Sequence, residues 1–229
     1  MKILEIRTVS VVGNADVQFL RIDPEDISIA LSEILKAIMD LSWLKNFDAE
    51  AVAKSYEHRA QKTIADIKEK FDKCDGGKLT KDAGEYVVSE LARETLVSEL
   101  GYLDIPLAEL LGKKTSGNPG FDFLSQNNTT DTVIFGEAKY VSAHSAYSRA
   151  VEQIREFVDD KKDVEDIADL RDFCTPNALI RASNGHKGFA AAFSAKSTSS
   201  DRIINAITAS ADFQILLKYE EIILVAVNL

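Results

Sequence analysis

GNPGFDFLSQNNTTDTVIFGEAKY, residues 117–140, is the stretch that decides the fold. Two apolar runs in it, residues 121–124 and 133–135, each predict a short β-strand. Residues 126–131 between them are rich in Asn and Thr, which favour a turn. The stretch therefore predicts a β-hairpin.

Charged side chains lie at the matching ends of the two predicted strands. Asp122 lies in the first strand, and Glu137 and Lys139 follow the apolar part of the second. Side chains alternate along a strand, so Glu137 and Lys139 share a face, and hairpin pairing brings Asp122 beside Glu137. Burying these charges at the edge of an apolar sheet is costly without a partner. Hard oxygen ligands suit Mg²⁺ or Mn²⁺, which leaves Lys139 free to act on a water or an oxyanion.

The triplet Glu137-Ala138-Lys139 differs from other acidic-x-Lys triplets by its setting. The sequence holds three more, and they lie in charged, helix-like stretches typical of solvated faces: Asp66-Ile67-Lys68, Asp159-Asp160-Lys161 and Asp160-Lys161-Lys162. Only the triplet at 137–139 ends an apolar strand that follows a strand with an Asp. The alternative is a surface hairpin with an incidental ion pair.

An Asp followed on the next strand by Glu-x-Lys resembles the active site of the PD-(D/E)xK nuclease superfamily. The superfamily's Pro-Asp is replaced here by Gly120-Phe121-Asp122, with Pro119 three positions before the Asp. The resemblance implies that Asp122, Glu137 and the main-chain carbonyl of Ala138 hold Mg²⁺ or Mn²⁺. It also implies that Lys139 orients or deprotonates the attacking water.

A helix predicted before the hairpin carries a further candidate ligand. Residues 80–100 have an apolar stripe at helical spacing, with Thr80 as the N-cap. Glu85 lies near the start of this helix, and in the superfamily a glutamate there can reach the metal. Glu90 and Glu94 are weaker alternatives. An acidic residue favoured by the helix dipole explains Glu85 equally well.

The segments on either side of the hairpin carry candidate DNA-binding residues. A helix is predicted from residues 142–145 to residue 160, and Arg149 and Gln153 lie four residues apart on it. The resemblance implies that Gln153 positions the scissile phosphate or the attacking water, while Arg149 suits a phosphate. Lys113 and Lys114 begin a Gly/Ser/Pro loop that either follows a phosphate backbone or is a bare connector.

The order of predicted elements agrees with the motif. From residue 80 it is a helix, a strand at 102–111 weakened by Pro106, the two hairpin strands, a helix, an irregular stretch at 173–200, a helix at 201–212 capped by Asp201, and a strand at 221–228. This order resembles the α-β-β-β-α-β core of the same superfamily. We therefore predict an α/β (α+β) fold in which residues 77–229 form a restriction-endonuclease-like core, a mixed sheet flanked by helices.

Residues 1–76 are predicted to form an N-terminal strand-helix extension, which is a candidate partner-binding region. Strands are expected at 2–12 and 15–22 around a Gly-Asn turn. Helices are expected at 24–41, capped by Asp23, and at 48–73, capped by Asp48. The run Asp-Gly-Gly-Lys at 75–78 marks the predicted boundary.

Composition limits the function classes. The 229 residues are 45% hydrophobic and 28% charged, and they contain no run of 18 apolar residues and no signal-peptide pattern, so we expect a cytoplasmic protein that does not enter a membrane. The formal net charge is −10, whereas a protein that binds DNA without a partner is usually basic. Either a local basic patch or a partner supplies the DNA affinity. The local candidates are Lys113, Lys114, Lys139, Arg149 and Arg155.

Gly-Phe-Asp-Phe-Leu and Phe-Gly-Glu-Ala-Lys-Tyr, together with the two-strand start, resemble the HamA family, the nuclease subunits of Hachiman anti-phage defence systems. The resemblance implies a metal-dependent DNA endonuclease controlled by a larger, DNA-binding helicase or ATPase subunit, HamB-like. Two alternatives remain open. One is a non-catalytic interaction subunit with a degenerate nuclease fold. The other is a stand-alone restriction endonuclease, against which the net charge argues.

Overall fold

A single mixed β-sheet organises the chain. A computed structural model describes residues 1–74, 78–111, 120–142 and 146–229. Within these residues the strands are β1 (Lys2–Thr8), β2 (Asp16–Asp23), β3 (Phe123–Asn127), β4 (Thr132–Lys139), β5 (Lys187–Ala195) and β6 (Glu221–Asn228). They pair in the order β1-β2-β6-β5-β4-β3. The four inner strands are parallel, and β1 and β3 pair antiparallel at the two edges.

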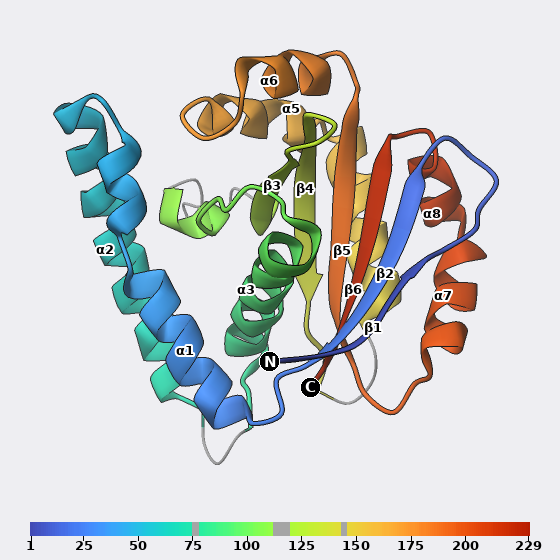
Figure 1. Ribbon diagram of the computed structural model, residues 1–229. Coiled ribbons are helices and arrows are strands. Elements are labelled where there is room, and N and C mark those ends of the chain that lie inside the picture. Colours follow the sequence, from blue (N-terminus) through green and yellow to red (C-terminus); the bar gives the residue numbers. More distant parts are fainter. Residues whose placement is uncertain (75–77, 112–119, 143–145) are drawn as a thin grey trace.

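Helices cover both faces of this sheet (Figure 1). The α-helices are α1 (Ile27–Met39), α2 (Glu50–Asp72), α3 (Lys81–Leu100), α4 (Tyr147–Asp159), α5 (Lys162–Asp166), α6 (Pro176–Ser183), α7 (Ser200–Thr208) and α8 (Ala211–Leu216). The 3-10 helices are η1 (Ser42–Asn46), η2 (Ala108–Leu111) and η3 (Ile167–Leu170). Helix α3 lies on one face, α4, α7 and α8 lie on the other, and α1 and α2 form an arm beyond α3 (Figure 1). The predicted α/β fold with a mixed sheet flanked by helices is thus confirmed.

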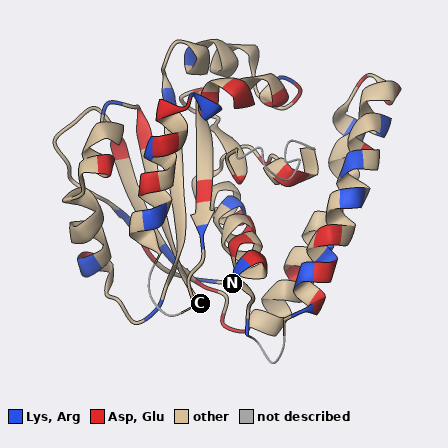
Figure 2. Ribbon diagram, turned by 180° about the vertical axis from the view of Figure 1, so that it is seen from behind, with Lys and Arg blue, Asp and Glu red and all other residues tan. Residues whose placement is uncertain are grey.

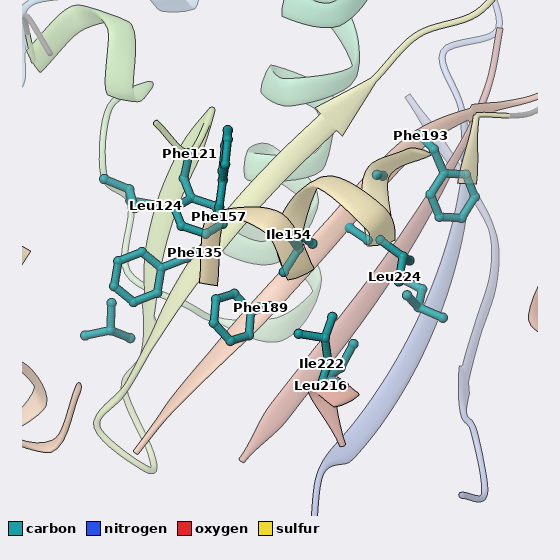
Figure 3. Close-up of a cluster of buried hydrophobic side chains, with 14 of the residues drawn as sticks. Phe121, Leu124, Phe135, Ile154, Phe157, Phe189, Phe193, Leu216, Ile222 and Leu224 are labelled. Atoms are coloured by element: carbon teal, nitrogen blue, oxygen red, sulfur yellow. The ribbon is translucent and has the colours of Figure 1, made fainter. Parts of the chain in front are cut away.

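Each face of the sheet buries its own apolar cluster. On the α3 side, Leu20, Ala190 and Ile223 pack with residues of α1, α2 and α3. On the other side, Phe135 and Phe189 pack with α4, at Ile154 and Phe157, in the cluster drawn in Figure 3. Burial on both faces explains why β5 and β6 are almost wholly apolar.

The core strand expected at residues 102–111 is absent. Residues 102–107 have no regular structure and lead into η2. Two main-chain hydrogen bonds still join this segment to the β3 edge, from Leu103 N–H to the Gln126 carbonyl at 2.9 Å and from Ala108 N–H to the Asp122 carbonyl at 3.2 Å. Pro106 lies between them and has no N–H to donate, so a regular ladder cannot form.

Strand β5 lies in the stretch that the sequence left irregular. It is buried along its whole length and pairs with both β4 and β6. Its sequence, KGFAAAFSA, is dominated by Ala and Gly, which are depleted in strands. Its composition therefore does not indicate a strand. Burial between two neighbouring strands overrides that propensity.

Three predicted helix caps are wrong. Helix α1 begins after Asp26, whose carboxylate accepts from two N–H groups of the first turn, whereas Asp23 accepts from a residue before the helix. Helix α2 has no side-chain cap, so Asp48 does not serve as one. Ser199, rather than Asp201, caps α7. The predicted cap of α3, Thr80, is confirmed because its hydroxyl accepts from Ala83 N–H at 3.3 Å.

The sheet crosses the boundary predicted at residues 76 and 77. Residues 75–77 lie outside the described residues. Strand β2, before that boundary, pairs in parallel with β6, near the other end of the chain, with Phe19 opposite Leu224. The division into an extension and a core stays a prediction, but the first two strands belong to the common sheet.

Candidate active site at the end of β4

The β3–β4 hairpin sets Asp122 against the Glu-x-Lys triplet. Phe123 pairs with Gly136, so the register continued by one residue places Asp122 opposite Glu137. Asp122 N–H donates to the Gly136 carbonyl at 2.8 Å. Its carboxylate Oδ2 accepts from Ala138 N–H at 2.8 Å. Both the main chain and the side chain of Asp122 are therefore fixed to the end of β4.

Glu137 and Lys139 form a largely buried ion pair. Their side chains are 2% and 19% exposed, and Lys139 Nζ lies 2.5 Å from Glu137 Oε1. The ammonium of Lys139 is engaged by the neighbouring carboxylate, and its expected action on a water or an oxyanion stays a prediction.

The protonation of Lys139 limits what it can do. Burial lowers its pKa, but the carboxylates of Glu137 and Asp122 outweigh burial and raise the pKa above the ordinary 10.5. Lys139 is therefore an ammonium at neutral pH. An ammonium can orient a water and neutralise an oxyanion, and whether Lys139 also deprotonates the attacking water stays a prediction.

Glu85 approaches this cluster from α3. Burial raises the pKa of its carboxyl, the charge of Lys139 lowers it, and the charge of Asp122 raises it, so the three groups lie close enough to interact. The alternatives on α3 lie elsewhere. Glu90 is buried in an ion pair with Arg93 at 2.6 Å, and Glu94 is exposed.

Tight packing of α3 brings Glu85 to the site. A Cβ atom on Gly84 would lie 2.2 Å from the ring of Tyr140, the residue that follows Lys139. Only a glycine lets the helix backbone rest directly on that ring. The Gly84-Glu85 pair thus places a carboxylate next to the end of β4.

A groove of about 400 Å³ runs between α3, the end of β4 and α4. It is lined by Lys81, Glu85, Lys139, Tyr140, Val141, Arg149, Glu152, Gln153 and Glu156. Four residues predicted from separate stretches therefore meet here: Glu85, Lys139, Arg149 and Gln153. Lys81 was missed, although its position one helical turn before Glu85 could have indicated it. A second hollow, of about 200 Å³, has Glu85 and Asp122 in its lining.

Of the other predicted cations, Arg155 is described by the structure and is not part of the groove lining. Lys113 and Lys114 lie outside the described residues. Arg155 forms ion pairs with Asp212 at 3.0 Å and Asp159 at 2.7 Å. Figure 2 shows charges of both signs spread over the helices, with acidic and basic positions meeting where β4 ends beside the start of α3.

The donors that fit a metal ion are two carboxylates and one carbonyl. Among the described residues, no group of three or more His, Cys, Asp or Glu is arranged to hold a metal, so direct ligation by Glu85 stays a prediction. Asp122 and Glu137, which the hairpin register places opposite each other, each carry carboxylate oxygens. The N–H and C=O of one strand residue point to the same edge, so Ala138, whose N–H reaches Asp122, directs its carbonyl there too. Mg²⁺ is commonly bound by one or two carboxylates with waters completing its shell, which this set satisfies.

Comparison with known proteins identifies no relative. No family model matches the chain, and neither a curated protein nor a solved structure matches it. Among the described residues, no helix is both long enough and apolar enough to cross a membrane.

Proposed function

We propose that this chain is a metal-dependent nuclease of the PD-(D/E)xK type, which hydrolyses phosphodiester bonds in DNA. The observation that carries the proposal is the bond from Ala138 N–H to Asp122, which joins the Asp to the Glu-x-Lys triplet. Helices on both faces of a mixed sheet support the restriction-endonuclease-like core that the proposal requires.

Each residue of the site has a role in this reaction. Asp122, Glu137 and the Ala138 carbonyl hold Mg²⁺ or Mn²⁺, with Glu85 beside them. The ion, when bound, polarises a phosphoryl oxygen and lowers the pKa of a water. Lys139 neutralises the negative charge that develops on the phosphate.

Two helices supply the contacts to the DNA backbone. Arg149 of α4 and Lys81 of α3 line the same groove and bind phosphate oxygens. Gln153, one turn along α4 from Arg149, hydrogen-bonds the scissile phosphate or the attacking water. Lys113 and Lys114 remain candidates for the adjoining backbone.

We further propose that the protein is the effector subunit of an anti-phage complex of the Hachiman type. The net charge of −10 supports a partner that carries the DNA affinity, a larger helicase or ATPase. The isolated chain should bind DNA weakly and with steep salt dependence. Co-purification from the native host tests this, and recovery as a tight, sequence-specific DNA binder on its own would restore the restriction-enzyme alternative.

One observation favours a non-catalytic subunit instead. The Lys139–Glu137 pair balances two largely buried charges without a metal. Calorimetric titration with Mn²⁺ separates the alternatives, since a structural ion pair predicts no binding at this site.

Glu137→Gln and Lys139→Met test the catalytic proposal directly. Each should lower Mg²⁺-dependent cleavage of linear DNA by about 100-fold or more, because Glu137→Gln removes a charged metal ligand and Lys139→Met removes the cation that neutralises the phosphate. The matched control is Lys68→Met in the triplet Asp66-Ile67-Lys68, whose lysine pairs with Asp72 on α2. It should cleave as the parent does.

The same assay shows whether a metal is needed. Excess EDTA should stop cleavage, and Mg²⁺ or Mn²⁺ should restore it. Full cleavage by both site variants, or in EDTA, contradicts the proposal.

A further inference from the structure

Helix α2 holds η2 through two side-chain hydrogen bonds. Arg59 Nη1 donates to the Leu111 carbonyl at 3.0 Å, and Thr63 Oγ1 donates to the Glu109 carbonyl at 3.2 Å. Arg59 and Thr63 lie one turn apart, so their side chains leave the same face of α2. Carbonyls at the end of a helix lack partners within it, and here α2 supplies them.

The other end of η2 is bonded to Asp122. Ala108 N–H donates to the Asp122 carbonyl at 3.2 Å, while Asp122 N–H donates to Gly136 on β4 at 2.8 Å. The main chain of Asp122 is thus held between η2 and β4. Its carboxylate, bonded to Ala138 N–H, follows the position of that main chain.

Aromatic contacts anchor α2 to the rest of the protein. The Arg59 guanidinium lies 4.5 Å from the centre of the Tyr56 ring. Tyr56 stacks on Phe47 with ring centres 4.9 Å apart, and Trp43 and Phe173 pack edgewise or tilted around this pair. These rings join η1, α2 and the segment before α6, so α2 is fixed to the body of the protein.

We propose that Arg59 and Thr63 are positioning residues that hold Asp122 in place through η2, so that α2 sets the metal affinity of the site. The proposal rests on the proposed function, because it takes Asp122 as a metal ligand. Groups that orient a ligand typically change metal affinity by 10- to 100-fold when they are removed. A partner that moves α2 would change the metal affinity by the same route.

The matched pair Thr63→Val and Thr63→Ser tests this inference in the full-length chain. Valine keeps the shape of threonine and removes the hydroxyl, whereas serine keeps the hydroxyl. Thr63→Val and Arg59→Ala should each weaken Mn²⁺ binding by about 10-fold in calorimetric titration, and Thr63→Ser should bind as the parent does. Lys54→Met is the surface control, since Lys54 pairs with Glu50 on the same helix.

Amide hydrogen exchange supplies a readout that needs no metal. Losing the Thr63 bond should speed exchange of the Ala108 and Asp122 amides by about fivefold, and Lys54→Met should not. Unchanged Mn²⁺ affinity and unchanged exchange in Thr63→Val and Arg59→Ala overturn the inference. Absence of Mn²⁺ binding in the parent chain, with faster exchange in Thr63→Val, overturns the nuclease proposal instead and leaves the mechanical link standing.

Discussion

Substitution of Gly84 tests the packing of a single residue, because helix propensity and steric packing predict opposite changes in the free energy of unfolding. Gly→Ala inside an ordinary helix stabilises by about 1 kcal/mol. Here the added Cβ would lie 2.2 Å from the Tyr140 ring, so we expect Gly84→Ala to destabilise by about 1–3 kcal/mol. Cleavage should fall as well, since Glu85 and Lys139 flank the contact. Urea unfolding measures the first effect, and the DNA assay measures the second.

Gly120→Ala is the control for this substitution. Among the described residues, the atoms nearest to its Cβ would be the Asp166 carboxylate oxygens at 3.5 Å, which is an ordinary contact. The unfolding free energy should change little. A Gly84→Ala protein as stable as the parent would show that Tyr140 moves aside freely and does not fix α3.

Sequence predicts the residues of the hairpin site better than those around it. Alternation and register follow from local pattern, so Asp122 and the triplet at 137–139 could be grouped in advance. The raised pKa of Lys139 depends on its own burial and on the charges of Glu137 and Asp122 beside it. The roles proposed for Lys81, Arg59 and Thr63 depend on how their helices pack against other parts of the chain, and no short-range sequence pattern encodes that packing.

At the scale of an element, the start of α1 separates a true cap from a false one. Asp26 accepts from Ser28 N–H at 2.8 Å and Ile29 N–H at 3.1 Å. Asp26→Ala should therefore destabilise the protein by about 1 kcal/mol. Asp48→Ala, at the start of α2, should leave the unfolding free energy unchanged. Equal losses in thermal unfolding would show that the two positions act through charge and not through capping.

The two segments that the sequence analysis assigned wrongly differ in their physical cause. Strand β5 is rich in Ala and Gly and becomes a strand because β4 and β6 pair with it on both sides. Residues 102–107 read as a strand but line the outer edge of β3 with only occasional bonds, because Pro106 interrupts them. For β5 the neighbouring strands decide, whereas for residues 102–107 the local Pro106 decides.

At the scale of the whole molecule, Glu221 should govern how stability depends on pH. It begins β6, and burial together with the charge of Asp16 raises its pKa to about 7. Its ordinary value is 4.5, so the unfolded chain loses this proton first as pH rises. The stabilisation from Glu221 is complete below about pH 4.5 and is lost by about pH 7.

The Tyr102 hydroxyl donates to the Glu221 carboxylate. Glu221→Gln should remove the pH dependence, because glutamine does not ionise and its side-chain oxygen can still accept this hydrogen bond. Relative to the variant, the parent should lose about 2–3 kcal/mol between pH 5 and pH 8. Urea unfolding of both proteins at the two pH values gives the difference. Parallel pH profiles would show that the carboxyl ionises in the folded protein without cost.

The pairing of β2 with β6 affects how fast the chain folds as well as which fold it adopts. Residues 16–23 form their ladder with residues 221–228, so closing the centre of the sheet requires contact across nearly the entire chain. Such long-range parallel pairing forms slowly, because the chain loses the entropy of loop closure before any stabilising contact between the strands is made. The strand that presents Glu137 joins the same sheet, so we expect the sheet that supports the site to be complete only after β6 has paired. A chain still being synthesised, or one that stops early, therefore lacks the scaffold on which this site is built.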